Sequence, residues 1–346
     1  MKYMKKVTHW RVTILLLILV LGATVILATA IGPVYIPPST TAGISANKLP
    51  LIGDLIRPSW SNAEEVIVLQ IRLPRVILGM LVGAALATAG CSMQGIFKNP
   101  MASPYVIGIS SGAALGATFS LATFAQINMY TLPLMAFAGA LAATLVVYNI
   151  ARVGGKLPTE TLLLAGIAVS IFLSAITSFL VYLSGESLHG IMFWLMGGLA
   201  GKGWSHVIII LPWICIGIII TYVFARGLNI MLLGEESAHH LGIDVEKLKK
   251  ILIVTSALIA ASAVAVSGII GFVGLIIPHI MRILVGPDHR ILIPSAVMTG
   301  GIFLVWSDTI ARIVMAPAEI PVGIITALFG APFFLYLIRK RKRPIF

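Results

Sequence analysis

The sequence predicts an all-α polytopic membrane protein, and three observations lead to this class. Of the 346 residues, 59% are hydrophobic and only 10% are charged, whereas soluble proteins carry about 25% charged residues. The mean hydropathy is +1.04. Apolar runs of about 20 residues recur from end to end, and each is long enough to cross a hydrocarbon core of about 30 Å. Short segments of alternating polarity, which are typical of a β-barrel, do not occur.

About ten apolar runs have the length of a membrane-spanning helix. They lie near residues 12–34, 72–97, 104–124, 131–151, 161–183, 205–225, 251–269, 271–285, 291–314 and 321–338. The stretch 248–286 is too long for one span, because a single helix of this length would reach about 60 Å. We expect a break marked by Gly268, Gly271 and Gly274. Residues 190–200 are apolar but too short to cross, which indicates a short re-entrant or interfacial helix.

The basic N-terminus followed by an apolar run resembles a signal peptide at first. However, the run continues from about residue 12 past Ile31, which exceeds the usual apolar region of about 7–15 residues. We therefore expect an uncleaved first helix, and we treat residues 1–346 as a single transmembrane domain.

The distribution of basic residues predicts the topology. With the N-terminus in the cytoplasm, 18 of the 24 lysines and arginines fall on the cytoplasmic side, as the positive-inside rule requires. Both termini are then cytoplasmic, in a multi-pass protein of the cytoplasmic (inner) membrane. This bias accounts for the net charge of +12 without nucleic acid as a partner. The basic tail at 339–343 indicates contact with anionic membrane lipid.

Residues 234–250, GEESAHHLGIDVEKLKK, form a polar insert between long apolar runs. The topology places this insert in the cytoplasm. A protein this apolar leaves little of itself in water, so we interpret the insert as a binding segment for a soluble partner.

Three arginines lie on the outer side, against the charge rule: Arg72, Arg75 and Arg312. They either extend to lipid headgroups or dock an anionic partner, whose approach rim charges would steer. Asp308 and Glu319 are near Arg312 in sequence and could pair with it locally.

Two apparent catalytic motifs do not carry catalysis. Gly108 to Gly112 fits G-x-S-x-G, but a nucleophile elbow needs a preceding strand and a triad. Gly108, Gly112 and Gly116 instead recur every fourth residue, as in a close helix-packing face. The segment 197–203, GGLAGKG, lacks the spacing of a Walker phosphate loop. We expect no catalytic residue, no metal site and no ATP site in this chain.

A faint internal repeat relates AALATAG at 84–90 to SAVAVSG at 262–268, and Pro100 to Pro278, at a common offset of 178 residues. The offset relates spans of opposite orientation. Such inverted repeats are typical of transport proteins, in which the solute path lies between the two halves.

Several segments together resemble one family, the ferric-siderophore, haem and cobalamin importer permeases, which are the membrane subunits of type II ABC importers. They lie at 70–117, 162–170, 193–201, 228–244, 268–294 and 308–338. The resemblance covers the chain from about residue 60 to the end, and 36–60 is the weakest part. It implies a type II importer permease fold of ten helices with an inverted repeat, a homodimer with a path at its interface, two cytoplasmic ATPase subunits and an extracytoplasmic solute-binding protein. ATP and magnesium would then bind the ATPase subunits.

The resemblance also implies roles for particular residues. A cytoplasmic coupling segment at 228–250 would contact the ATPase through Glu235, Glu236, Ser237, Ala238, His239, Leu241 and Gly242. The outer arginines Arg72, Arg75 and Arg312 would dock the binding protein. An inner gate would lie at Pro158, Thr159 and Glu160, where many relatives have a smaller residue in place of Glu160.

The predicted function is therefore import of a bulky metal chelate, with ferric siderophore first and cobalamin or haem next, by alternating access driven from a separate ATPase. The alternative is an ion-coupled secondary transporter of a small solute, which would require an acidic or histidine side chain within the membrane. No aspartate or glutamate falls in the middle of any expected span.

Overall fold

The computed structural model describes residues 2–48, 50, 53, 58–123 and 129–340; most of the predicted basic tail 339–343 lies outside them. In this part of the chain the regular elements are helices, apart from one isolated β-bridge between Val153 and Lys156. The α-helices are α1 (Lys2–Ala30), α2 (Pro38–Asn47), α3 (Asn62–Val66), α4 (Leu73–Ile96), α5 (Ile109–Thr123), α6 (Thr131–Ala151), α7 (Thr159–Leu183), α8 (Leu188–Leu195), α9 (Trp204–Val223), α10 (Ala225–Met231), α11 (Glu235–His240), α12 (Val245–Ser267), α13 (Val273–Val285), α14 (His289–Ile313) and α15 (Val322–Lys340).

The predicted polytopic all-α class is confirmed. Among the described residues, seven helices are long and apolar enough to cross a membrane by length and composition. The shorter helices α5, α13 and α15 account for the three remaining predicted runs. The short helix expected near 190–200 is α8, which has eight residues.

The second span begins earlier than predicted. A capping box at Ser61 and Glu64 starts α3, a π-helical turn (Ile67–Arg72) follows, and α4 continues it. Pro74 lies in the first turn of α4. Proline lacks an N–H and is tolerated in the first turn of a helix. The π turn before it joins α3 to α4, so that one continuous helical span runs from Asn62 to Ile96.

The predicted break between 248 and 286 is confirmed, since α12 ends at Ser267 and α13 begins at Val273. Gly268 takes a φ of +67° at the end of α12, a conformation that glycine adopts without a steric penalty. Within a membrane, irregular backbone must be satisfied by protein groups. The Tyr105 hydroxyl does this by donating to the Ile270 carbonyl at 2.8 Å.

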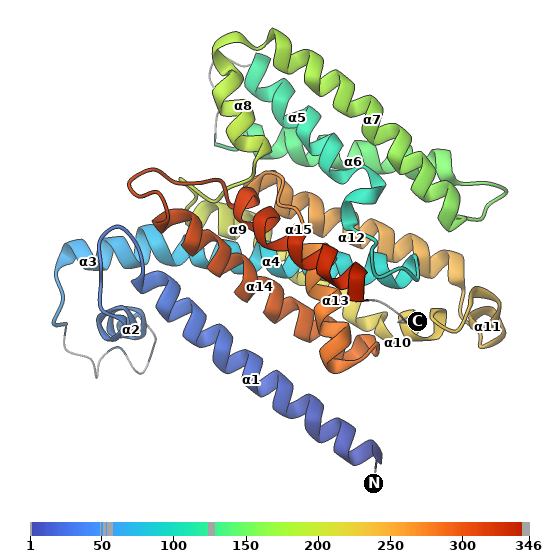
Figure 1. The fold of residues 1–346 in the computed structure, drawn as a ribbon, viewed down its shortest axis with the longest axis horizontal. Helices are drawn as coiled ribbons and strands as arrows, with labels where there is room; N and C mark the ends of the chain where they lie inside the picture. Colours follow the sequence, from blue (N-terminus) through green and yellow to red (C-terminus); the bar gives the residue numbers. More distant parts are fainter. Residues whose placement is uncertain (1, 49, 51–52, 54–57, 124–128, 341–346) are drawn as a thin grey trace.

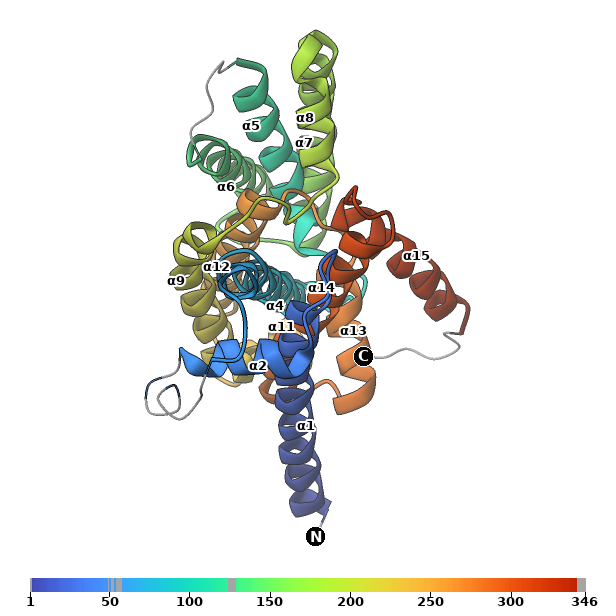
Figure 2. The same cartoon turned by 90° about the vertical axis from the view of Figure 1, so that its left-hand side faces the viewer.

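Helix α4 occupies the centre of the bundle, and both views show α12, α13 and α14 around it (Figure 1, Figure 2). Small residues allow these helices to approach closely. A Cβ atom built on Gly83 would lie 2.2 Å from the Gly300 carbonyl oxygen, and one built on Gly90 would lie 1.9 Å from that of Gly274. Such backbone contacts are the usual basis of helix association in membranes.

The helices α5, α6, α7 and α8 lie together on one side of this core, and α1 lies on the other (Figure 2). The predicted glycine face of α5 is confirmed at Gly112 and Gly116, where added Cβ atoms would lie 2.3 Å from the Gly139 carbonyl and 2.1 Å from that of Met135 on α6. By contrast, only 17% of the most apolar window of α1 is buried, and the same holds for α7. These two helices expose most of their apolar surface.

The two copies of the short sequence repeat, 84–90 and 262–268, do not have the same local structure. Gly90 lies inside α4, whereas its counterpart Gly268 ends α12. Pro100 lies in the loop after α4, whereas Pro278 is inside α13. A match among small residues therefore does not define the register of an inverted repeat here.

We predict that Gly90→Val destabilises the fold by about 3 kcal/mol, because overpacking against a backbone carbonyl requires α4 and α13 to separate. Gly22→Val is the matched control, since a Cβ at Gly22 would meet no atom within 4 Å. Thermal unfolding midpoints in detergent compare the two variants. Equal midpoints would show that the close approach contributes no stability.

Candidate functional sites at the two ends of the bundle

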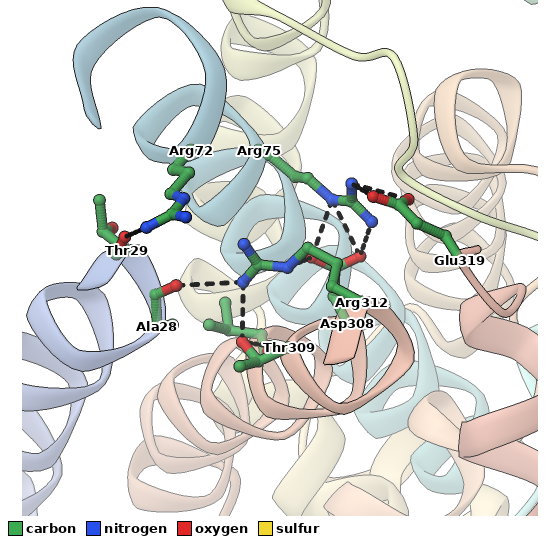
Figure 3. Close-up of polar contacts among 9 residues, drawn as sticks. Ala28, Thr29, Arg72, Arg75, Asp308, Thr309, Arg312 and Glu319 are labelled. Carbon is green, nitrogen blue, oxygen red and sulfur yellow. Dashed lines mark hydrogen bonds and ion pairs between the residues drawn. The ribbon is translucent and has the colours of Figure 1, made fainter. Parts of the chain in front are cut away.

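The first site is an arginine cluster formed by Arg72, Arg75 and Arg312 with Asp308 and Glu319 (Figure 3). The Arg75 guanidinium joins α4 to α14 and to the segment after it. Its Nη2 lies 2.8 Å from Asp308 Oδ1, and its Nη1 lies 2.9 Å from Glu319 Oε1. Arginine suits this arrangement because its planar fork can bind two carboxylates at once.

Arg312 shares the carboxylate of Asp308, with 3.2 Å between Arg312 Nε and Asp308 Oδ2. Its Nη2 also donates to the Ala28 carbonyl at 3.1 Å and to the Thr309 hydroxyl at 3.0 Å. Two buried cations therefore share one buried anion. Removing one partner of such a group leaves an uncompensated charge, which costs far more than the intact group contributes.

Arg72 holds the end of α1. Its Nη1 donates to the Thr29 carbonyl at 3.2 Å and to the Ala30 carbonyl at 2.9 Å, and its Nη2 donates to the Val34 carbonyl. These carbonyls belong to the last turn of α1 and the segment after it, where intrahelical donors are lacking. The arginine supplies those donors, and its charge complements the negative end of the helix dipole.

In this conformation the three arginines bind groups of the chain itself, and their docking of a partner stays a prediction. Arg72, Arg75 and Arg312 are only 5%, 8% and 4% exposed. The predicted local pairing of Asp308 with Arg312 is confirmed, but Glu319 pairs with Arg75 instead. Arg75 and Glu319 are separated by 244 residues in the chain, so their contact depends on the packing of α4 against α14 and has no local signal in the sequence.

The second site is the predicted coupling segment at the opposite end, where Figure 1 shows α10 and α11 on the right, away from α2 and α3 on the left. The segment folds into two short helices. Five of its seven predicted contact residues are exposed: Glu236, Ser237, His239, Leu241 and Gly242. Ala238 was predicted as a contact, but it is fully buried in the core. Its small side chain lets α11 lie against the body, so Ala238 positions the contacts rather than making one.

Two leucines project from this polar segment. Leu233 is 68% exposed and Leu241 is 61% exposed. Leu233 lies within the predicted segment 228–250 but was not named as a contact, because the sequence does not distinguish it from the apolar residues 230–232 before it. Exposed leucines beside charged and polar groups can insert into an apolar groove of a partner.

The predicted gate residues begin α7, with Pro158 at its N-cap position and Thr159 and Glu160 in its first turn. Pro158 and Glu160 are exposed. The structure brings the gate segment and the coupling segment together through one side chain. Lys249 Nζ lies 2.8 Å from Glu235 Oε1 and 3.2 Å from the Leu157 carbonyl oxygen.

Within the described ranges, no three histidine, cysteine, aspartate or glutamate side chains gather as metal ligands would. The side chains of both sites can pair charges and bind proteins.

The comparisons with known proteins identify the family. The FecCD transport family matches residues 15–340. This chain belongs to that family. A cobalamin import system permease protein of Halobacterium salinarum is 50% identical over 81% of this chain and 75% of that protein. A hemin transport system permease protein of Yersinia pestis is 43% identical over 82% of this chain and 86% of that protein. A Fe(3+)-citrate import system permease protein of Bacillus subtilis is 39% identical over 98% of this chain and 99% of that protein.

A solved structure agrees with this assignment. It is described as an inward-facing conformation of a transporter assigned to the metal-chelate type of ABC transporters. It superimposes with a TM-score of 0.82 at 32% identity, over 95% of this chain and 99% of that one. The FecCD permease is thus a multi-pass protein of the membrane, as the sequence predicted.

We predict that Asp308→Asn lowers the free energy of unfolding by about 3–5 kcal/mol, because it leaves Arg312 buried with no carboxylate partner. Lys48→Ala is the control, since it removes an ion pair to Glu65 in which the lysine side chain is 55% exposed. Such a pair contributes about 0–1 kcal/mol. Thermal unfolding of both variants tests this, and an equally small effect would refute the structural importance of the shared carboxylate.

Proposed function

We propose that this chain is the transmembrane permease subunit of a binding-protein-dependent ABC importer that moves a bulky metal chelate into the cytoplasm. The observation that carries the proposal is the pair of exposed leucines, Leu233 and Leu241, on the polar segment at one end of the bundle. This is the surface that a permease driven by a separate soluble subunit requires. Family membership and the names of the relatives support it.

In this proposal two cytoplasmic ATPase subunits bind the coupling segments of a homodimer, and both termini face the cytoplasm. ATP and magnesium bind the ATPase subunits. ATP binding there moves the coupling segments and changes which gate of the path is open, as a ligand biases a two-state element. Pro158, Thr159 and Glu160 belong to the inner gate in this scheme. The permease breaks no bond in its substrate.

The substrate class follows from the relatives, whose names refer to cobalamin, hemin and ferric citrate. All are metal chelates too large for a narrow selectivity filter, so a wide path with alternating gates is needed. We propose a ferric siderophore as substrate, followed by cobalamin and haem. Selection among them falls largely to the solute-binding protein.

We propose that the solute-binding protein docks at the arginine cluster. Glu319 has a side chain 32% exposed and covers Arg75 from the outer side. A carboxylate of the docking protein would compete with Glu319 for Arg75. Docking thus requires that part of the internal pairing be exchanged for pairing with the partner.

An ion-coupled secondary transporter would need a carboxylate free to bind and release its ion inside the membrane. Asp308 is the buried carboxylate that could be considered, since it is 2% exposed. It is held by both Arg75 and Arg312. Because its two oxygens are already bound by guanidinium groups, Asp308 is poorly placed to bind and release a coupling ion, which supports the ABC importer.

We predict that Leu233→Asp and Leu241→Asp reduce copurification of the ATPase at least about tenfold, because each replaces an anchor with a charge that must be desolvated. Tyr35→Ser is the control, since Tyr35 is 72% exposed but lies just after α1, at the opposite end. The test uses the chain reconstituted with its ATPase and binding protein in liposomes. ATP-independent transport by the chain alone would refute the proposal and favour the secondary transporter.

We predict that Glu319→Gln tightens docking of the binding protein at low salt, because Arg75 becomes available to it. An ion pair worth about 1 kcal/mol corresponds to about fivefold in the dissociation constant. Glu186→Gln is the charge-matched control, since Glu186 is also acidic but exposed and outside the cluster. Surface plasmon resonance measures both. Equal affinities for the two variants would place docking elsewhere.

A further inference from the structure

A single buried lysine connects three segments near the proposed cytoplasmic end. Lys249 lies on α12 and is only 1% exposed. Its ammonium group pairs with Glu235 of α11 at 2.8 Å and lies 3.8 Å from Glu246 Oε1, one turn away on its own helix. It also donates to the Leu157 carbonyl at 3.2 Å. A buried ammonium group persists only when it is paired and hydrogen-bonded in this way.

Lys249 and Glu246 together bind both backbone polar groups of Leu157. The Leu157 N–H donates to Glu246 Oε2 at 2.9 Å, and the Leu157 carbonyl accepts from Lys249. The Leu157 side chain is 4% exposed and packs in the core. Leu157 therefore cannot shift relative to α12 without losing two hydrogen bonds at once.

The segment that ends at Leu157 is a short hairpin of residues 152–157 between α6 and α7. Val153 and Lys156 exchange two backbone hydrogen bonds of 3.0 Å. Gly154 and Gly155 form the turn with φ of +58° and +81°, which matches the tight hairpin turn that glycine favours. Because Leu157 is bonded directly to Pro158, the N-cap residue of α7, a displacement of Leu157 is passed to the first turn of α7.

Glu235 is the movable partner in this group. Its side chain is 42% exposed, whereas that of Lys249 is 2% exposed. Glu235 begins α11, between Leu233 and Leu241 in the chain. A protein that binds those leucines and moves α11 would therefore pull on Lys249 through its strongest ion pair.

We propose that Lys249 is a positioning residue that links α11 to the hairpin 152–157, so that movement of α11 changes the position of the start of α7. The link rests on the proposed function, in which α11 contacts the ATPase and α7 begins at the inner gate. It connects the two through a charge pair instead of through a continuous helix.

The test compares Lys249→Met, which keeps the length of the side chain and removes its charge, with Lys250→Met. Lys250 is the adjacent lysine on the same helix and is exposed. Each variant is reconstituted in liposomes with the ATPase and the binding protein. We expect Lys249→Met to retain ATPase binding and ATP hydrolysis but to lower the transport per ATP hydrolysed by about tenfold, a usual size for coupling between sites. Lys250→Met should match the wild type.

A second readout separates linkage from simple destabilisation. Spin labels are placed at Lys156→Cys on the hairpin and His240→Cys on α11, both exposed, with the exposed Cys215 replaced by serine. Electron–electron resonance then measures the distance between the two segments. We expect one narrow distribution in the parent and a broad one in Lys249→Met, while Lys249→Arg retains the narrow one.

As a single substitution, Glu235→Gln should broaden the distance distribution. In the Lys249→Met background it should cause no further broadening, because both changes remove the same ion pair. An unchanged distance distribution in Lys249→Met would overturn the proposal. So would a parallel loss of ATP hydrolysis and transport with a normal distribution. If no ATPase binds the wild-type chain, the proposed function fails, yet the distance measurement still tests the link.

Discussion

The close fit of α4 against its neighbours is the constraint on which the rest of the structure depends. In a bilayer, lipid tails are as apolar as leucine, so helices associate only where their surfaces fit or hydrogen bonds join them. Gly83 and Gly90 bring the backbone of α4 against α14 and α13. This approach places Arg75 of α4 beside Asp308 of α14. The arginine cluster is thus a consequence of small residues two to four turns away.

The two ends of the bundle share one kind of contact, a buried ion pair between distant segments. At each end a buried basic side chain joins segments that are far apart in the sequence: Arg75 with Asp308 and Glu319, and Lys249 with Glu235 and Leu157. Between the two ends, close packing of small residues brings the helices together, supplemented by single hydrogen bonds such as that of Gln94 with the Leu275 carbonyl. A buried ion pair is stable only in good geometry, so each end favours a small number of discrete arrangements, which is consistent with the alternating access proposed above.

The helices were predictable from the sequence because span length and hydropathy are local properties, and so was the break before α13. The extension back to Asn62 was not, because residues 62–66 contain an asparagine and two glutamates and do not belong to an apolar run. Among the site residues, too, some properties were predictable from local sequence and others were not. The exposure of Leu241 and Glu236 follows from a polar segment, whereas the burial of Ala238 and the pairing of Arg75 depend on tertiary contacts. Sequence spacing alone identifies neither.

The bonds from Arg72 to the end of α1 have a consequence for biogenesis. The chain is synthesised from its N-terminus, so α1 can enter the bilayer before the second span, which carries Arg72, does so. Until then the carbonyls of Thr29 and Ala30 have only water or headgroups as donors. Insertion of the second span replaces those transient donors with a guanidinium. The first helix is therefore fixed in place late, by a residue of its successor, and its tilt is set by assembly instead of by its own sequence.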